Sequence, residues 1–129
     1  MIVSSVLDGA KITTDIGDKF VIDTDQPSPF GEDKAPSPFD IFLVSFAACT
    51  AYFAQRYCRK WKLPHDGIQV ELDPVFSSQH VLTDIHLKLK VPADFPRDHL
   101  AGLLRNAGAC SVKKAMDAPP AVTLELVEA

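Results

Sequence analysis

The fold is decided by the stretch from Ser37 to Lys62, SPFDIFLVSFAACTAYFAQRYCRKWK. Its start has the features of a helix N-terminus, because Ser37 suits the N-cap, Pro38 the first helical position, and the Asp40 carboxylate can accept from free backbone N–H groups. Apolar residues then continue from Ile41 to Phe53 around nearly the whole helix, which is typical of a helix buried on most sides. We predict one helix to about Lys62, roughly 35 Å long, at the centre of the core.

The size and composition of the chain predict a single domain over residues 1–129 with one hydrophobic core, since 47% of its 129 residues are hydrophobic. The net charge of −4 argues against nucleic acid or an anionic membrane as partners, because both bind clustered Lys and Arg. The N-terminus lacks the basic and apolar regions of a signal peptide, and the apolar run from Ile41 to Ala54 is shorter than the roughly 20 residues that span a bilayer. We expect a soluble, cytoplasmic protein.

The cysteine and histidine content argues against two other classes of protein. Three cysteines, an odd number without a CxxC motif, do not form the pattern of a secreted disulfide framework. The four histidines do not pair closely with one another or with cysteine, so a zinc site has little support. We therefore expect neither a metal nor a cofactor.

Short runs of β-favouring residues and two further helices surround the long helix. An antiparallel meander of three strands is predicted at residues 2–7, 11–14 and 19–23. An ordered loop is predicted at residues 24–38, which contain four prolines. Alternating residues at 68–72 and 85–91 predict a hairpin joined around residues 77–79, and residues 122–126 predict a last strand. The order βββ-α-ββ-α-α-β predicts an α+β fold with a mostly antiparallel sheet packed around the long helix.

The two further helices are expected after Pro96 and from Cys110 to Met116. The first of them has an apolar stripe and a glycine at its C-cap, Gly108. The residues of this stripe, which we expect to face the core, are Leu100, Leu103, Leu104 and Ala107.

Two of the three cysteines lie where a thiol can be chemically active. Cys110 is at a predicted helix start, with Lys113 and Lys114 in the next turn, and a helix N-terminus and nearby cations both favour a thiolate. Cys49 lies in the middle of its helix, so its activation needs a group from elsewhere. Cys58 lies about 180° around the helix from Cys49 and is interpreted as a core or surface residue. Because free cysteine behaves as a small buried hydrophobe, a purely structural role for Cys49 stays open from these residues alone.

Two segments resemble the OsmC and Ohr family, the osmotically inducible and organic-hydroperoxide-resistance proteins. Residues Ala35 to Thr50, APSPFDIFLVSFAACT, resemble the core motif of that family. Residues Cys110 to Met116, CSVKKAM, are similar to its second cysteine motif, which follows the first at about this distance. The resemblance covers nearly the whole chain, and it implies an OsmC-like fold that forms an intertwined homodimer with sites at the subunit interface.

The resemblance also implies a thiol redox activity. In active members the cysteine that corresponds to Cys49 attacks the peroxide and becomes a sulfenic acid, which condenses with the cysteine that corresponds to Cys110. A dithiol reductant, a lipoylated protein in the best-known branch, then reopens the bridge. We expect an organic substrate, because four phenylalanines are candidate walls of an apolar pocket, although plain core packing is their alternative role. They are Phe39, Phe42, Phe46 and Phe53.

The sequence departs from the hydroperoxidase pattern at two positions. The family glutamate precedes the helix cysteine by ten residues, where this chain has Phe39, and the family arginine comes from the N-terminal strands, where no Arg precedes Arg56. Lys11 is a possible cation, although an ammonium lacks the planar fork of Arg. Two hypotheses follow. The chain is either an organic hydroperoxidase that uses Cys49 and Cys110, or a divergent member that binds an apolar small molecule in an interfacial pocket.

Overall fold

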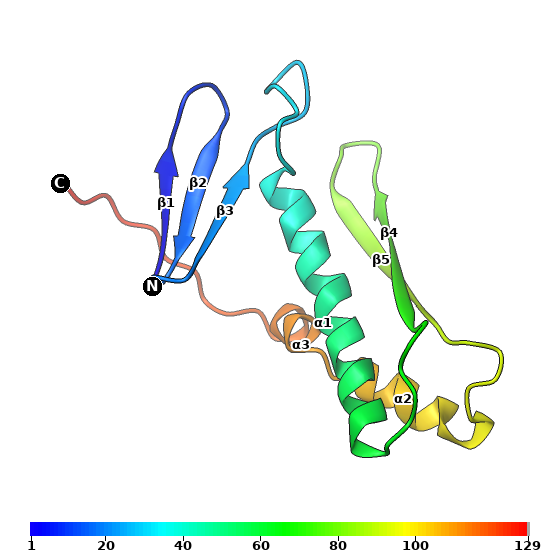
Figure 1. The fold of residues 1–129 in the computed structure, drawn as a ribbon. Helices are drawn as coiled ribbons and strands as arrows, with labels where there is room; N and C mark the ends of the chain where they lie inside the picture. The colour runs from blue at the N-terminus through cyan, green and yellow to red at the C-terminus, as the bar shows by residue number, and fades with distance from the viewer. Residues whose placement is uncertain (129) are drawn as a thin grey trace. The chain divides into compact units, whose positions relative to one another are not determined.

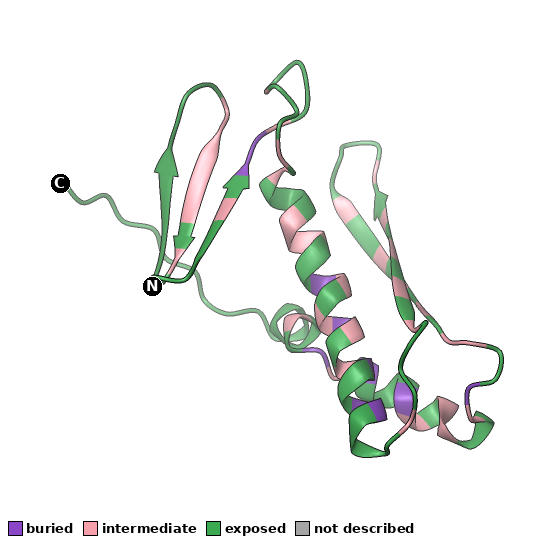
Figure 2. Ribbon diagram, in the orientation of Figure 1, coloured by how far each residue is buried: buried purple, intermediate pink, exposed green. Residues whose placement is uncertain are grey.

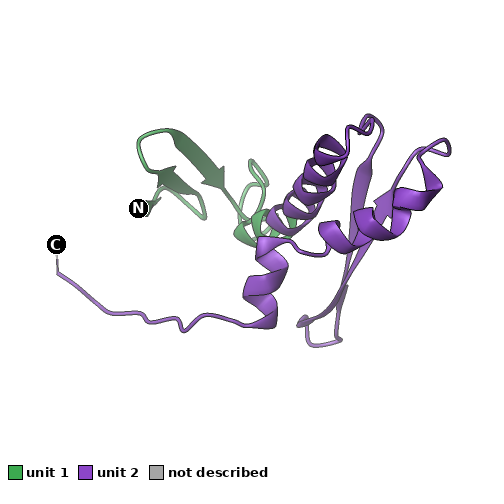
Figure 3. Cartoon of the chain, turned by 90° about the horizontal axis from the view of Figure 1, so that it is seen from below, with its two compact units in different colours: residues 1–44 green, residues 45–129 purple. Residues whose placement is uncertain are grey.

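The computed structural model describes residues 1–128 (Figure 1). The elements in chain order are β1 (Ile2–Val6), β2 (Ile12–Ile16), β3 (Phe20–Thr24), α1 (Pro38–Lys60), β4 (Gln69–Phe76), β5 (Leu82–Lys90), the 3₁₀ turn η1 (Arg97–His99), α2 (Leu100–Ala107) and α3 (Ser111–Asp117). The chain divides into two compact units, residues 1–44 and 45–129, shown in Figure 3. The α+β class with antiparallel strands and a long helix is confirmed.

Local hydrogen bonds fix both ends of helix α1. The Asp40 N–H donates to Ser37 Oγ at 3.1 Å, and the Ser37 N–H donates to Asp40 Oδ2 at 3.1 Å, which confirms the predicted N-cap as a capping box. At the other end Lys62 has a φ of 56°, and the Leu63 N–H donates to the Cys58 carbonyl at 2.8 Å. This left-handed cap ends the helix at Lys60, two residues before the predicted end.

The first unit contains the predicted meander, in which β2 pairs with both β1 and β3. Ile2 lies opposite Ile16, which in turn lies opposite Phe20, so these side chains share one face of the sheet. We call this the apolar face of the meander, and its members are Ile2, Val6, Ile12, Ile16, Phe20 and Ile22. Ile2 is 68% exposed and Phe20 64% exposed, so the single chain leaves this face largely uncovered.

The proline-rich loop after β3 is ordered around one buried carboxylate. Asp25 is 1% exposed and accepts backbone N–H bonds from Gln26 at 2.8 Å, Lys34 at 3.1 Å and Glu32 at 3.3 Å. These bonds, the one from Gln26 above all, outweigh burial and hold the pKa of Asp25 below its ordinary value. A Cβ on Gly31 would overlap the Asp25 carboxylate, so only glycine allows the chain to approach it this closely.

The second unit has its core between the C-terminal half of α1 and α2. The predicted hairpin is confirmed, with β4 and β5 antiparallel and Leu72 opposite Leu87. The most buried cluster joins α1, α2 and the turn before η1, and its members are Ala54, Tyr57, Cys58, Phe95, Leu103 and Ala107. Tyr57 Oη hydrogen-bonds to His99 Nδ1 at 2.8 Å, which ties η1 to α1. Gly108 is the C-cap of α2, as predicted, with a right-handed φ of −71°.

Two predictions about burial are wrong for the single chain. Only Phe46, Thr50, Ala54, Tyr57 and Cys58 are buried among the α1 residues, all of which the structure describes. Figure 2 shows most of α1 in the colours of exposed and intermediate residues. Val44 is 56% exposed, because the described elements cover one side of the helix rather than most of it. Leu104, expected in the apolar stripe of α2, is 65% exposed while its neighbour Leu103 is buried.

The predicted last strand at residues 122–126 is also absent from the described chain. Its alternating apolar side chains are almost fully solvent-exposed, with Leu124 at 99% and Leu126 at 97% (Figure 2). An alternating sequence forms a strand only when another strand satisfies its backbone groups and a surface covers its apolar side. Within residues 1–128 this segment has neither.

The length and composition of α1 alone would allow it to cross a membrane, and 17% of its 18-residue apolar window is buried. The apolar run from Ile41 to Ala54 is shorter than this window. In the structure, α1 supplies Ala54, Tyr57 and Cys58 to the core cluster of the second unit. The helix therefore packs as the core helix of a folded domain on this side, while apolar residues such as Val44 and Tyr52 stay exposed on its other sides.

Candidate active site

The structure brings Cys49 and Cys110 together, although they lie on different elements of the second unit. Cys49 is half-buried on α1, and Cys110 is completely buried at the N-cap of α3. The Cys110 side chain forms a hydrogen bond with the Cys49 sulfur. Both thiols are free, and the sulfur atoms are not at the distance of a disulfide. The arrangement is therefore a reduced thiol pair in contact through a hydrogen bond.

The start of α3 acts on Cys49 rather than on Cys110. Partial burial by itself raises the pKa of Cys49, but hydrogen bonds from the Cys110 side chain and from the backbone N–H groups of Val112 and Ser111 outweigh it. The net pKa of Cys49 is below its ordinary value, which increases the thiolate fraction at neutral pH. The sequence placed Cys110 at a helix start correctly, but the free amide groups of that start are directed at the other cysteine.

Tight packing before α3 positions these donors. Leu103 and Ala107 of α2 pack into the core cluster with Ala54 and Cys58 of α1. Only residues 108–110 separate α2 from α3, so the beginning of α3 is held close to the same part of α1. Cys110 has the extended backbone of an N-cap residue, with φ −54° and ψ 133°, and its carbonyl accepts the first helical hydrogen bond at 3.0 Å.

Cys58 belongs to the core and not to this site. It is completely buried within the core cluster, and burial raises the pKa of the Cys58 thiol. A protonated, inaccessible thiol is a poor nucleophile. This observation decides between the two roles that the sequence left open for Cys58.

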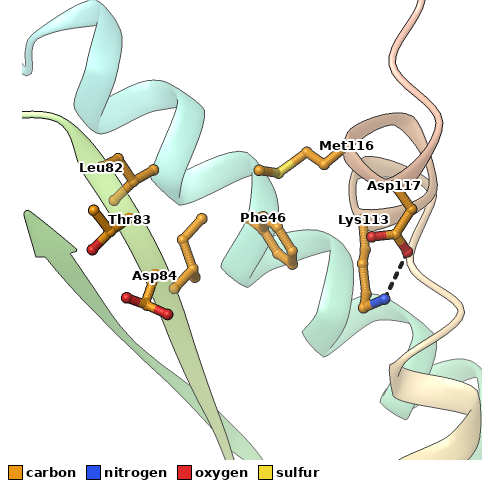
Figure 4. Close-up of a pocket in the computed structure, with 8 residues that line it drawn as sticks. Phe46, Leu82, Thr83, Asp84, Lys113, Met116 and Asp117 are labelled. Atoms are coloured by element: carbon orange, nitrogen blue, oxygen red, sulfur yellow. Dashed lines mark hydrogen bonds and ion pairs between the residues drawn. The ribbon is translucent and has the colours of Figure 1, made fainter.

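A cavity of about 230 Å³ is lined in part by Phe46, which lies one helical turn before Cys49 in α1 (Figure 4). Its apolar lining consists of Phe46, Leu82, Ile85 and Met116, and its polar lining consists of Thr83, Asp84, Lys113 and Asp117. Figure 4 shows Phe46 of α1 between the β5 side chains and those of α3. Phe46 precedes Cys49 by three residues, and Lys113 follows Val112 directly, so α1 and α3 contribute both to the cavity lining and to the thiol pair. Cys49 and Cys110 themselves are not in the lining.

Of the four phenylalanines predicted as pocket walls, Phe46 lines this cavity and the other three are not in its lining. The rings of Phe39 and Phe42 contact each other with centroids 5.6 Å apart. The Arg56 guanidinium lies 5.6 Å from the centroid of the Phe53 ring. The role of these three residues in a pocket stays a prediction.

The predicted cation, Lys11, lies in the first unit. Its ammonium is 3.1 Å from the Glu32 carboxylate, and it also faces Asp25 at the base of the ordered loop. The Lys11 ammonium is thus already paired with a carboxylate within residues 1–44. Its contribution to the thiol site stays a prediction.

Backbone donors are the part of the site that the sequence could not reveal. Every residue except proline carries an N–H group, so Ser111 and Val112 have no side-chain signature of this role. The only local sign was a cysteine at a helix start, which indicates that free amides are nearby but not which sulfur receives them.

Replacing Ser111 by proline tests the backbone contribution. Proline is well tolerated at the first position of a helix, and the extended backbone of Cys110 suits a residue before proline. The Ser111→Pro variant loses one N–H donor to Cys49, so we expect a higher Cys49 pKa and slower alkylation by iodoacetamide at pH 7. The measurement is the alkylation rate against pH, with Ser111→Ala as the control that keeps the N–H group. Equal titration curves for both variants would exclude this amide as a donor.

Comparison with known proteins identifies the family and the fold. A family model described as OsmC-like protein matches residues 31–125. The fold is similar to that of a putative osmotic stress induced and detoxification response protein from Psychrobacter arcticus, with 18% identity over 88% of this chain and 85% of that one and a TM-score of 0.75. An OsmC-like protein from Mycoplasma pneumoniae is 16% identical over 92% of this chain and 87% of that one, with a TM-score of 0.75.

A third solved structure is the organic hydroperoxide resistance protein OhrB of Bacillus subtilis, with 20% identity over 92% of this chain and 90% of that one and a TM-score of 0.59. At these identities the structural similarity establishes the fold alone. No curated protein matches the sequence. The family model, however, spans most of the chain. The chain therefore belongs to the OsmC-like protein family, and this membership supports a redox or peroxide-resistance role in general.

Proposed function

We propose that this protein is a thiol peroxidase that reduces organic hydroperoxides through Cys49 and Cys110. The Cys49 thiolate attacks the distal oxygen of ROOH, the O–O bond breaks, and the alkoxide takes up a proton and leaves as ROH. Cys49 becomes a sulfenic acid. The Cys110 thiol then attacks the Cys49 sulfur, which forms the disulfide and releases water. An external dithiol, such as a lipoylated protein, returns both cysteines to thiols by exchange and is itself oxidised to a disulfide.

The observation that carries this proposal is the hydrogen-bonded contact between the two thiols at a site that lowers the pKa of Cys49. A peroxidatic cysteine needs a populated thiolate and a resolving thiol within reach, and Cys49 has both groups beside it. The two backbone amides offer an alternative to the family glutamate and arginine that this chain lacks. They favour the anionic form of the sulfur by donating hydrogen bonds to it.

The exposures of the two cysteines predict which sulfur the reductant attacks. Cys49 is half-buried, whereas Cys110 is completely buried in the reduced protein. The incoming thiolate of the reductant therefore reaches the Cys49 sulfur first and releases the Cys110 thiol. The mixed disulfide forms on Cys49.

A second function is favoured by the cavity and by Phe39 at the glutamate position. A protein that has lost peroxidase activity could keep the apolar cavity to bind a small apolar molecule. The two functions differ in one measurement, which is the consumption of cumene hydroperoxide by the purified protein with excess dithiol. Multiple turnovers support the peroxidase. Binding of cumene hydroperoxide without its consumption would support the binding protein instead.

We further propose that the chain acts as a homodimer in the cytoplasm, where cellular reductants keep thiols reduced. The apolar face of the meander is largely exposed in the single chain, and so are Val44 on α1 and the alternating side chains of Val122, Leu124 and Leu126. The meander also ends in two unpaired edge strands, β1 and β3, within the described residues. Exposed apolar faces and unpaired strand edges are energetically unfavourable in water. A second copy of the chain has the same surfaces, so two copies can cover each other in a symmetric dimer.

The dimer is tested by sedimentation equilibrium on the purified protein. The chain mass is 14.1 kDa, so a dimer has twice this mass. Replacing Phe20 by aspartate places a charge on the exposed apolar face and should shift the equilibrium toward monomers. The matched control is Val21→Asp, which places the same charge on the opposite face of the same strand. A monomeric wild-type protein at micromolar concentration would contradict the proposal.

A further inference from the structure

We propose that the C-terminal end of α1 is a docking surface for an acidic segment of a partner protein. This surface, called here the basic end of α1, consists of Arg56, Arg59, Lys60, Trp61 and Lys62. Along the helix Lys60 lies eleven residues, or roughly 16 Å, beyond Cys49. The inference is therefore independent of the thiol chemistry.

The positive charges of this surface are exposed and uncompensated. No acidic residue occurs between Arg56 and Asp66, and the four basic side chains form no ion pair with any residue of the described chain. The turn η1, whose His99 contacts Trp61, contributes one charge of each sign, from Arg97 and Asp98. The helix dipole offsets only about half an elementary charge at a helix C-terminus. The surface therefore keeps a net positive charge.

Lys62 occupies a backbone position that suits glycine better. Its φ is 56°, its N–H donates to the Arg59 carbonyl at 3.3 Å, and the Leu63 N–H donates to the Cys58 carbonyl at 2.8 Å. These bonds form a Schellman motif, in which the left-handed residue is usually glycine because a Cβ is unfavourable there. Lysine at this position lowers the stability of the fold, which is typical of a residue that serves binding rather than folding.

Trp61 gives the surface a rigid aromatic centre that is 52% exposed. The centroid of its ring lies 5.5 Å from that of His99 and 6.2 Å from that of Tyr57, and Tyr57 Oη is hydrogen-bonded to His99 Nδ1 at 2.8 Å. Lys60 Nζ lies 5.8 Å from the Trp61 centroid. A side chain that is held in place before binding loses little conformational entropy on binding. Tryptophan and arginine are also enriched at the energetic centres of protein interfaces.

The charge of the rest of the chain favours a protein segment over a nucleic acid or a membrane. The chain has a net charge of −4, although this end contributes four positive charges. A long anionic polymer or a lipid surface would also meet the acidic remainder of the chain and be repelled by it. A short acidic segment contacts only the basic end of α1. A second copy of the chain that met this surface about a two-fold axis would bring the same positive charges to it.

The test uses a labelled synthetic peptide in which glutamates flank one phenylalanine, and the same peptide with glutamine in place of glutamate. Fluorescence anisotropy at low salt should show about tenfold tighter binding of the glutamate peptide, and added salt should weaken it. The chain has a single tryptophan, so a change in the emission of Trp61 locates the peptide at this surface. Trp61→Ala should weaken the binding about tenfold.

Lys62→Gly separates binding from folding. The change removes one charge and relieves the left-handed backbone, so we expect about threefold weaker peptide binding together with a melting temperature about 3 °C higher. The control Lys88→Gln removes the same charge from an exposed position on β5 and should leave peptide binding unchanged.

Equal affinities for the two peptides, an unchanged emission of Trp61 at saturation, or equal effects of Lys62→Gly and Lys88→Gln on binding would each overturn the inference. Tighter binding of oligothymidylate, or of vesicles that contain phosphatidylglycerol, than of the glutamate peptide would also overturn it, because the partner would then be a nucleic acid or a membrane. A lower melting temperature of Lys62→Gly would contradict the role assigned to this lysine.

Discussion

Cys49→Ser loses the reduction of cumene hydroperoxide, with a fall in kcat/KM on the order of a thousandfold or more. A serine hydroxyl is not ionised at neutral pH and cannot accept the peroxide oxygen, whereas the Cys49 thiolate is stabilised by two backbone amides and the Cys110 side chain. The measurement is the rate of peroxide consumption with excess dithiol at constant protein concentration. The variant keeps the size of the side chain, so its circular dichroism should match that of the wild-type protein.

Two other cysteine variants locate the chemistry. Cys58→Ala, which changes a buried core thiol far around the helix, should keep the activity of the wild type. Cys110→Ser should stop the reaction after one turnover and leave a sulfenic acid on Cys49, which dimedone labels and mass spectrometry detects. Full activity of Cys49→Ser, or loss of activity in Cys58→Ala without unfolding, would contradict the assignment of Cys49 as the attacking thiol.

Leu103→Ala destabilises the protein by about 3 kcal/mol, the usual cost of a Leu-to-Ala change at a fully buried position. Leu103 is 1% exposed and lies in the cluster that joins α1 to α2. The change removes apolar contacts and leaves a cavity next to the segment that carries Cys110 into the site. Urea denaturation at a fixed protein concentration measures the free energy of unfolding, because an oligomer makes this value depend on concentration.

The adjacent residue provides the matched control. Leu104→Ala makes the same chemical change on the same helix, but Leu104 is 65% exposed in the single chain. We expect a loss within about 0.5 kcal/mol, which is typical of an exposed position. Equal losses for the two variants would show that Leu104 is covered in the assembled protein, and would contradict the difference in burial between the two leucines.

These two leucines show how far the sequence could predict the fold. The helical spacing of Leu100, Leu103, Leu104 and Ala107 correctly indicated a helix with an apolar side, but an apolar stripe does not say how much of its width a neighbour covers. The local elements were predicted well where the signal was local. The capping box of Ser37 and Asp40, the meander and the hairpin all follow from short-range patterns.

The predictions that were wrong depend on partners outside the segment concerned. The alternating residues from Val122 to Leu126 have the sequence of a strand, yet no strand of the described chain pairs with them. The exposed sides of α1 have the composition of a buried helix, yet the described residues cover only one side. In both cases the sequence indicates that burial is favourable, and the single chain does not provide the covering surface.

The sequence by itself determined the family, the two cysteines of interest and the order of the helices and strands, because motifs, caps and periodicity are encoded by residues close together in the chain. Only the tertiary structure decided which thiol receives the free amides at the start of α3, that Cys58 belongs to the core, and which side chains line the cavity at Phe46. The physical reason is that hydrogen bonding, burial and the lining of a cavity depend on groups brought together in space. Backbone donors such as those of Ser111 and Val112 are present at nearly every residue, and packing selects the ones that act.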